Sequence, residues 1–303
     1  MKKIYVLEKF DFSSEQLQRL RSLGEVKLYD MASAEQQMEA ACNADAIMVD
    51  WIPPDPMLER MHKGQIMCLA YTGYSWVKNI PLAKKNGVVI CNSPNYATNA
   101  VAEHHLALIL ACAKHVVYFH NIHKRGGTVP FNRGRELAFS KVGIIGLGRI
   151  GYRLAELLAP YGVEIMTCND VPQNREGIKD VDLHTLLKEC DVVCNTCRLT
   201  PQTKNMIGLN ELKLMKPTAI LTSTTGGVIN LDELAEFLQD NELFGVGLDD
   251  VNQENYPQSL RENDLVVCTY HRAFDTDKSQ SNRINLCIDN IEAFFKGKPI
   301  NTV

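Results

Sequence analysis

A run of glycines directly after an apolar segment is the feature that most restricts the fold of this chain. The segment KVGIIGLGRIGYRLAELL begins at Lys141, and its first part, Val142–Ile145, predicts a strand that is buried on both faces. From Ile150 onward the apolar residues recur at helical spacing, which predicts a helix immediately after the glycines. A buried strand, a tight turn and a helix in direct succession are typical of an α/β fold with a parallel sheet.

The three glycines have the spacing G-x-G-x-x-G, at Gly146, Gly148 and Gly151. In such a unit the first glycine allows the tight turn, the second lets a pyrophosphate approach the backbone, and the third lets the helix pack on the strand. The backbone amides of Arg149 and Ile150 are expected to face the phosphates at the positive end of the helix. The pattern predicts a dinucleotide site in preference to a purely structural turn.

The next expected strand, Glu164–Cys168, is followed by Asn169 and Asp170, and either residue could occupy the place that contacts the adenosine ribose. An acid in this place accepts a hydrogen bond from the 2′-hydroxyl and repels a 2′-phosphate. The nearest following arginine is Arg175, so no arginine stands directly beside the position to bind such a phosphate. We expect NAD as the cofactor, with NADP as the less favoured alternative.

Short apolar runs alternate with helical segments along nearly the whole chain of 303 residues, which is too long for one ordinary core. We expect an α/β fold of two doubly wound parallel-sheet domains, in which a Rossmann domain, residues 99–273, is inserted into a flavodoxin-like domain, residues 1–98 and 274–303. The strands expected in the flavodoxin-like domain are Ile4–Leu7, Val26–Tyr29, Ala46–Val49, Met67–Tyr71 and Val88–Cys91. Those expected in the Rossmann domain are Val142–Ile145, Glu164–Cys168, Val192–Thr196, Ala219–Thr222, Gly245–Leu248 and Leu265–Cys268. Long helices are expected from Ala97 to about Lys124 and from Asp277 to Lys296.

The composition excludes several classes of partner. A net charge of −4 provides no basic surface for nucleic acid or for an anionic membrane. The first residues, MKKIYVLEKF, lack the long apolar region of a signal peptide, and no stretch reaches the length of a membrane span. We therefore expect a cytoplasmic protein with no nucleic-acid or membrane partner.

Metal binding is not expected either. The ten cysteines lie mostly inside apolar runs, as small buried side chains do in a chain kept in a reducing compartment. One cysteine cluster lies in a predicted strand without the second ligand pair of a zinc site, and three histidines near residue 120 are expected on the surface. These clusters are Cys190, Cys194 and Cys197, and His115, His120 and His123.

The order of several motifs resembles that of the D-isomer-specific 2-hydroxyacid dehydrogenase family, and within it most closely glycerate dehydrogenases and hydroxypyruvate reductases. The similar stretches are AYTGYSWV from Ala70, SPNYATNAVAEH from Ser93, GIIGLGRIG from Gly143, LTPQT from Leu199, LMKPTAILT from Leu214, GVGLDDVNQE from Gly245 and the final GKPINTV. They cover essentially the whole chain in the family's order. The resemblance implies an NAD-dependent oxidoreductase that acts on the CH–OH group of a 2-hydroxy acid, or on the matching 2-keto acid.

The resemblance also implies roles for individual residues. His271 falls on the family's proton donor, and Glu254 on the carboxylate that raises the pKa of this histidine so that it can donate near neutral pH. Cofactor contacts are implied for Ser223, Thr224 and Asp249. The substrate carboxylate is expected to bind backbone amides of a loop formed by Thr72, Gly73 and Tyr74. This loop belongs to the flavodoxin-like domain, which is therefore expected to be the substrate domain.

One residue departs from the family pattern. Thr225 precedes Gly226 and Gly227, where relatives have an arginine that binds the keto-acid carboxylate. A hydroxyl has neither the charge nor the forked geometry of a guanidinium. Another cation could replace it, and the candidates are Arg272, Lys78, Arg133 and Arg198.

The sequence leaves three interpretations open. The chain is an active NAD-dependent reductase of 2-keto acids with Thr225 at the catalytic position; or it reduces a ketone or imine without an adjacent carboxylate; or it is an NAD(H)-binding regulatory or scaffolding protein with little catalysis. The presence of both Glu254 and His271 favours catalysis, since a protein that only binds has no use for a proton-donating pair.

A homodimer is also expected from the resemblance, because relatives pair through the region of the helix that begins at Ala97. An apolar stripe on this helix could form the contact. The stripe is Val101, Leu108, Ala111 and Val116.

Overall fold

The computed structural model describes residues 1–74, 77–128, 132–249 and 256–303. The chain divides into two compact units, and each is described by itself. Unit 1 consists of Met1–Ala97 and Asp275–Val303, and unit 2 is Thr98–Phe274.

Unit 1 is built on a five-stranded sheet in which all pairings are parallel, in the order β2-β1-β3-β4-β5. This is the strand order of a flavodoxin-like doubly wound sheet. Its strands are β1 (Lys3–Val6), β2 (Glu25–Leu28), β3 (Ala46–Val49), β4 (Ile66–Leu69) and β5 (Val89–Cys91). Its helices are α1 (Ser14–Leu23), α2 (Ala34–Asn43), α3 (Asp55–Arg60), α4 (Ile80–Lys85) and α12 (Asp277–Phe295).

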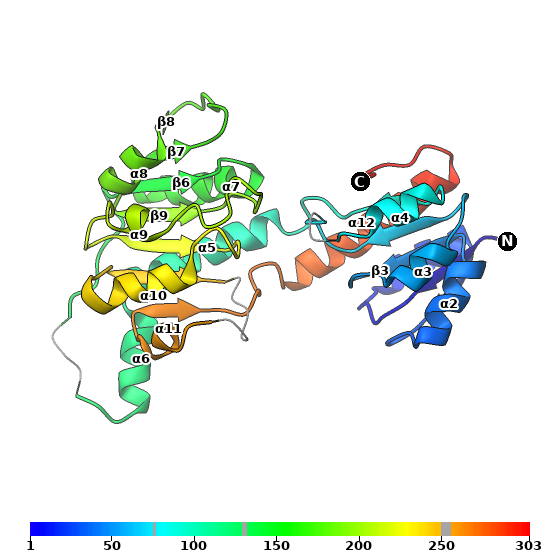
Figure 1. Ribbon diagram of the computed structural model, residues 1–303, viewed down its shortest axis with the longest axis horizontal. Helices are drawn as coiled ribbons and strands as arrows, with labels where there is room; N and C mark the ends of the chain where they lie inside the picture. Colours follow the sequence, from blue (N-terminus) through cyan, green and yellow to red (C-terminus); the bar gives the residue numbers. More distant parts are fainter. Residues whose placement is uncertain (75–76, 129–131, 250–255) are drawn as a thin grey trace. The chain divides into compact units, whose positions relative to one another are not determined.

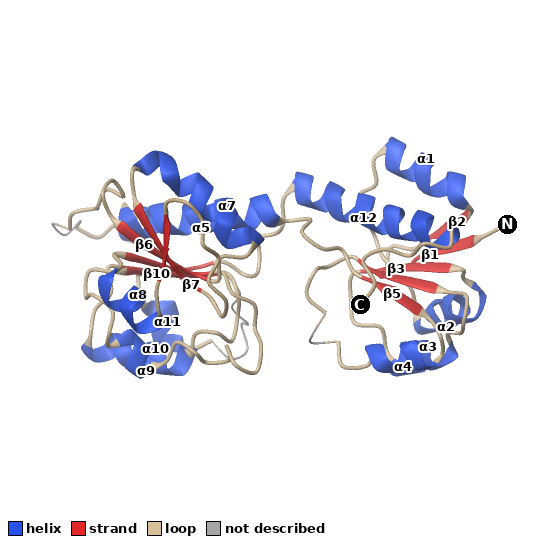
Figure 2. Cartoon of the chain, turned by 90° about the horizontal axis from the view of Figure 1, so that it is seen from above, coloured by secondary structure: helices blue, strands red, loops and turns tan. Residues whose placement is uncertain are grey.

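Helices cover both faces of this sheet, because its central strands are apolar on both sides (Figure 2). Helices α2, α3 and α4 pack on one face, and α1 and α12 pack on the other. Helix α12 comes from the carboxyl-terminal end of the chain and packs beside strands formed by the amino-terminal part of the chain (Figure 1). Helix α1 begins with the expected capping box, in which Ser13 and Gln16 bond to each other's backbone amides.

Unit 2 is built on a seven-stranded sheet with only parallel pairings, in the order β12-β11-β10-β9-β6-β7-β8. Counted from β6, this is the Rossmann order with one strand added at the edge. Its strands are β6 (Lys141–Ile145), β7 (Glu164–Cys168), β8 (Ile178–Asp180), β9 (Val192–Asn195), β10 (Ile220–Ser223), β11 (Gly245–Leu248) and β12 (Val266–Cys268). Its helices are α5 (Thr98–Ala113), α6 (Val116–Lys124), α7 (Arg149–Leu158), the 3-10 turn η1 (Ala159–Tyr161), α8 (Leu183–Glu189), α9 (Leu209–Leu212), α10 (Leu231–Asp240) and α11 (Gln258–Glu262).

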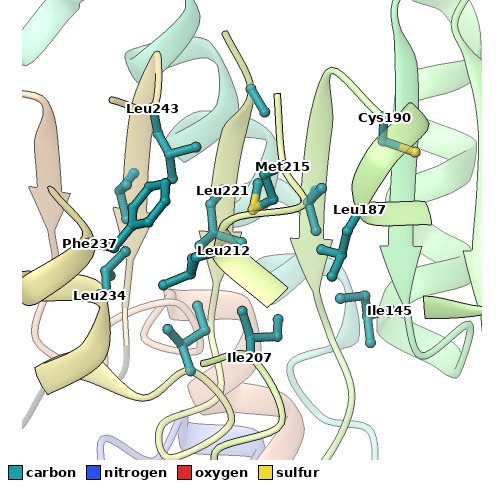
Figure 3. Close-up of a cluster of buried hydrophobic side chains, with 14 of the residues drawn as sticks. Ile145, Leu187, Cys190, Ile207, Leu212, Met215, Leu221, Leu234, Phe237 and Leu243 are labelled. Atoms are coloured by element: carbon teal, nitrogen blue, oxygen red, sulfur yellow. The ribbon is translucent and has the colours of Figure 1, made fainter. Parts of the chain in front are cut away.

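The core of unit 2 also has two layers, one on each face of the sheet. Helices α5 and α7 pack on one face, and α8, α9, α10 and α11 contribute to the core on the other (Figure 2). Figure 3 shows the second layer, where side chains such as Leu187, Leu212 and Phe237 project from the helices toward Ile145 and Leu221 of the strands. This packing fixes the sheet on which the site is built.

The expected two-domain α/β fold is confirmed, and every expected strand is present with its ends within two residues of the prediction. Strand β8, however, was not predicted. It is a three-residue edge strand, Ile-Lys-Asp, that pairs with β7 and is only partly buried. A short edge strand of this kind has no apolar run for a sequence pattern to detect.

The expectation of one continuous helix from Ala97 to Lys124 was wrong. Helices α5 and α6 meet at a bend of 60°, and His115 between them has a φ of +51°. The imidazole of His115 is buried and stacks on Phe244, with ring centroids 4.4 Å apart, so His115 is not the surface residue that was expected. Leu108 is also buried, against β11, and so cannot contribute to a surface stripe.

Within the described residues, no single helix is both long and apolar enough to cross a membrane, although the bent pair α5 and α6 together meets that length and composition test. Seven of the residues of α5 are buried.

Candidate active site

The glycine turn lies where the strand order of unit 2 reverses. Strand β6 has β7 on one side and β9 on the other, and ligands of such sheets bind at this point, beyond the carboxyl ends of the strands. Gly146 has a φ of +89°, and a Cβ added to it would lie 2.8 Å from Cα of Cys197. A Cβ added to Gly151 would lie 2.4 Å from the carbonyl oxygen of Gly146. Both positions therefore require glycine for reasons of packing alone.

Gly148 differs from the other two glycines. A Cβ added to it would meet no atom within 4 Å, so its surroundings leave room for a ligand to approach the backbone. Helix α7 begins at Arg149, directly after Gly148, and the first amides of a helix have no partner inside it and attract anions. The turn thus fits the pyrophosphate of a dinucleotide, and contacts by Arg149 and Ile150 remain predictions.

The two residues after β7 have different surroundings. The side-chain oxygen of Asn169 accepts a hydrogen bond from the backbone amide of Leu147 at 2.5 Å, so Asn169 lies directly against the glycine turn. Asp170 is exposed to solvent.

Ser223 is the last residue of β10, and Thr224 and Thr225 follow it in the loop. The Ser223 hydroxyl donates to the carbonyl of Thr225 at 3.1 Å and accepts from its amide at 3.3 Å. The side-chain amide of Asn195, at the end of β9, also donates to this hydroxyl at 2.9 Å. Ser223 therefore closes a local turn that holds Thr225 in place.

His105 of α5 lies beneath the same loop and is fully buried. Its Nδ1 lies 3.2 Å from the hydroxyl of Thr222, and its Nε2 lies 2.9 Å from that of Thr224. Burial lowers the pKa of His105 to about 3, so the imidazole is neutral, with one nitrogen donating and the other accepting. No motif in the sequence pointed to a role for His105.

The turn that carries His271 is built around the buried carboxylate of Asp249. This carboxylate accepts hydrogen bonds from the backbone amides of Arg272 at 2.8 Å and Ala273 at 2.9 Å. The backbone amide of His271 donates to the carbonyl of Asp249 at 2.5 Å, and His271 has a φ of +50°. Asp249 thus holds His271 in a left-handed conformation at the end of β12.

A second contact supports this turn from α5. The hydroxyl of Thr269 donates to the Asp249 carboxylate at 2.6 Å, and Nε2 of His104 lies 2.9 Å from that hydroxyl and 3.5 Å from the carboxylate. The imidazole of His271 is exposed and contacts Phe274 edge to face, with ring centroids 5.5 Å apart. Glu254 lies outside the described residues, so its expected pairing with His271 stays a prediction.

In unit 1 the expected substrate loop follows β4. The hydroxyl of Thr72 donates to the carbonyl of Ser93 at 2.8 Å, and the carbonyl of Thr72 accepts from the side-chain amide of Asn92 at 2.6 Å. Gly73 and Tyr74 are exposed. The loop is therefore anchored through Thr72, and its next two residues are accessible to solvent.

The comparisons with known proteins agree with this geometry. The family model described as "D-isomer specific 2-hydroxyacid dehydrogenase, NAD binding domain" matches residues 106–273, more than half of the chain. A glycerate dehydrogenase from Methylorubrum extorquens is 32% identical over 296 residues, which cover 92% of this chain and 92% of the relative. A glyoxylate reductase from Thermococcus litoralis is 34% identical over 82% of this chain and 79% of its own length.

This chain belongs to the D-isomer-specific 2-hydroxyacid dehydrogenase family. Solved structures show the same fold. The NAD complex of a D-isomer-specific 2-hydroxyacid dehydrogenase from Lactobacillus delbrueckii subsp. bulgaricus has a TM-score of 0.83 and is 24% identical, and the match covers the full length of both chains. An acyclic imino acid reductase solved with NADPH and D-arginine has a TM-score of 0.87, again at 24% identity and full coverage.

As a 2-hydroxyacid dehydrogenase, the chain is an NAD-dependent oxidoreductase that acts on a CH–OH group, and unit 2 holds its Rossmann NAD-binding domain. Membership of the family favours the interpretation as an active dehydrogenase over that of a regulatory protein. Within the described residues, no group of three His, Cys, Asp or Glu side chains is arranged to hold a metal ion.

Four cations were proposed to replace the family arginine, and the structure describes all of them. Arg272, Lys78, Arg133 and Arg198 are exposed. The described structure shows a further arginine at the carboxyl edge of unit 1, Arg283 of α12, whose side chain is only 11% exposed and pairs with Asp50 after β3. Arg283 was not predicted, because its partner Asp50 lies far away along the chain.

Glu8 accepts a hydrogen bond from the backbone amide of Asp50 at this same edge of unit 1. Burial, together with the nearby Asp50 charge, raises the pKa of Glu8 from its ordinary value to about 7. The folded chain therefore holds a proton on Glu8 at pH values where the unfolded chain has lost it.

Gly148 and Gly151 are distinguished by a pair of alanine variants. Gly151→Ala is expected to destabilise unit 2 by about 1–3 kcal/mol, because the new methyl meets backbone that cannot yield. Gly148→Ala is expected to keep its melting temperature but to bind NADH at least about tenfold more weakly, since its methyl fills the space left for phosphate. Thermal unfolding and fluorescence titration with NADH measure both effects. Unchanged NADH affinity in Gly148→Ala would contradict the placement of the cofactor.

Glu8 makes the stability of unit 1 depend on pH. Because its folded pKa is raised, the stability present below about pH 4.5 is lost as the pH rises through about 7. Glu8→Gln, which stays neutral, is expected to flatten the fall in the free energy of unfolding between about pH 5 and 8. Urea unfolding followed by tryptophan fluorescence measures this effect in unit 1, which contains both tryptophans, Trp51 and Trp76. Glu59→Gln, at an exposed position of α3, is the control and should keep the wild-type slope; equal slopes in all three proteins would refute the prediction.

Proposed function

We propose that this chain reduces the carbonyl of a small 2-keto acid such as glyoxylate or hydroxypyruvate to the D-2-hydroxy acid, with His271 as the proton donor. The relatives named glyoxylate reductase, glycerate dehydrogenase and hydroxypyruvate reductase support this substrate class. The observation that carries the proposal is the left-handed turn at His271, fixed by the buried carboxylate of Asp249.

The chemistry explains why such a turn is needed. NADH, when bound at the glycine turn, supplies a hydride to the carbonyl carbon, and the carbonyl oxygen must then take up a proton. An imidazolium placed at the end of a strand can donate this proton, and a carboxylate beside it raises its pKa toward neutrality. We assign these two roles to His271 and Glu254. Asp249 acts through the backbone of residues 271–273 and is a positioning residue in this scheme.

The remaining site residues receive roles by the same reasoning. Ser223 and Thr224 contact the cofactor, while the backbone amides of Thr72 and Gly73, beside Tyr74, hold the substrate carboxylate. Thr225 occupies the place of the family arginine and contributes a hydroxyl only, so carboxylate binding depends more on the loop of unit 1. The anchoring of Thr72 to Ser93 and Asn92 supports this assignment, because a loop set before binding loses less entropy on binding.

The domain roles follow from the site. We assign residues 99–273 as the NAD-binding domain and residues 1–98 with 274–303 as the substrate domain, an assignment supported by the family model at 106–273. A homodimer through the region of α5 and α6 is proposed as well, with exposed Val116 and partly buried Val101 and Ala111 as contact residues. All ten cysteines are free, which supports a cytoplasmic location.

The proton donor is tested with His271→Asn, because asparagine tolerates the positive φ that alanine does not. We expect kcat with glyoxylate or hydroxypyruvate to fall by roughly 10²–10⁴-fold, while NADH affinity stays within about twofold. Stopped-flow oxidation of NADH and fluorescence titration measure the two quantities. His184→Asn, an exposed histidine of α8, is the matched control. Retention of full turnover in His271→Asn would refute the assignment.

The effect of Thr225 is tested by restoring the family residue. Thr225→Arg is expected to raise kcat/KM for glyoxylate by about tenfold or more, because a guanidinium forks onto a carboxylate. Thr225→Lys supplies the charge without the fork and is expected to gain less. No gain in Thr225→Arg, with NADH still bound tightly, would favour a substrate without the adjacent carboxylate or a regulatory role.

A further inference from the structure

The end of β7 carries an amide where a Rossmann sheet commonly has an acid. Both N–H groups of the Asn169 side chain are engaged, one by the hydroxyl of Thr167 at 3.1 Å and one by the carboxylate of Asp180 at 3.0 Å. Its oxygen accepts from Leu147 in the glycine turn. Asn169 thus offers a further ligand only the second lone pair of its oxygen, and it carries no charge.

Asp180 lies on β8, where it is paired in register with Thr167 of β7. Its second carboxylate oxygen accepts from the backbone amides of Gln173 at 3.2 Å and Asn174 at 3.1 Å. Three N–H groups therefore hold this carboxylate in one place, and it is half-buried. Asp170, the other acid near the turn, is exposed.

We propose that Asp180 provides the fixed negative charge by which this dehydrogenase prefers NADH to NADPH, with Asn169 linking that charge to the glycine turn. The inference rests on binding of the cofactor at that turn. A 2′-phosphate on the ribose would approach the end of β7, where the Asp180 carboxylate is hydrogen-bonded to the very side chain that contacts Leu147. Repulsion between charges closer together than the Debye length, which is about 8 Å at physiological ionic strength, is only partly screened.

The next arginine along the chain, Arg175, has a contact of its own on α7. The guanidinium of Arg175 lies over the ring of Tyr152 on α7, 5.0 Å from its centroid, and is held there by a cation–π contact. The ribose hydroxyls of NADH are instead met by an acceptor, the Asn169 oxygen, which suits a hydroxyl and not a phosphate.

The test measures the dissociation constants of NADH and NADPH by fluorescence titration without substrate, so it does not depend on turnover. In Asp180→Asn the ratio of the NADPH constant to the NADH constant is expected to fall at least about tenfold, whereas in Asp170→Asn it should change by no more than about twofold. The effect of Asp180→Asn should also shrink in high salt. The double variant Asn169→Asp with Asp180→Asn returns the charge to the end of β7 and is expected to restore the preference for NADH.

Three results would overturn the proposal. They are an unchanged ratio in Asp180→Asn, an equal weakening of both cofactors in that variant, and a larger shift in Asp170→Asn. Failure of the wild-type chain to bind either cofactor is a different result, because it would refute the cofactor site itself and not only the role of Asp180.

Discussion

The site depends on a close approach of two backbone segments that only glycine permits. The carbonyl of Gly146 lies where a Cβ on Gly151 would stand, and Gly146 itself packs against Cys197 beyond β9. This contact brings the amino end of α7 to the point where the strand order reverses. Because all strands of the sheet are parallel, β7, β10, β11 and β12 end at the same edge. The ends of these strands and the residues that follow them include Asn169, Ser223, Asp249 and His271. One packing constraint therefore sets the shape of the turn at which we expect the cofactor.

Buried polar groups give these loops their shape. Asp249 is a buried carboxylate, and such a group is tolerated only when donors surround it. Its hydrogen-bond donors are the hydroxyl of Thr269 and the backbone amides of Arg272 and Ala273. These hydrogen bonds fix the backbone conformation beside His271. His105 acts in a comparable way beneath the loop of Thr225, as a neutral imidazole between two threonine hydroxyls. The geometry expected for proton transfer thus follows from the pairing of groups that do not themselves react.

Local patterns predicted part of this site and could not predict the rest. The glycine turn was identifiable because strand, turn and helix are adjacent in sequence, and His271 because it ends a strand within a known family pattern. The supporting residues His104 and His105 were missed, since their partners Thr269 and Thr222 lie more than a hundred residues away along the chain. Two adjacent histidines within a largely apolar helix were an available signal, because a buried histidine needs polar partners.

The sequence by itself determined the two-domain α/β class, the positions of all but one strand, the family and the glycine turn. The spacing of apolar residues and the residue types that form turns are local properties of the chain, so they can be identified without the structure. Only the tertiary structure decided that α5 and α6 bend at a buried His115, that β8 joins the sheet edge, and that Asn169 lies between Leu147 and Asp180. Each of these features depends on contacts between residues that are distant in the chain, and such contacts produce no regular spacing of residue types in the sequence.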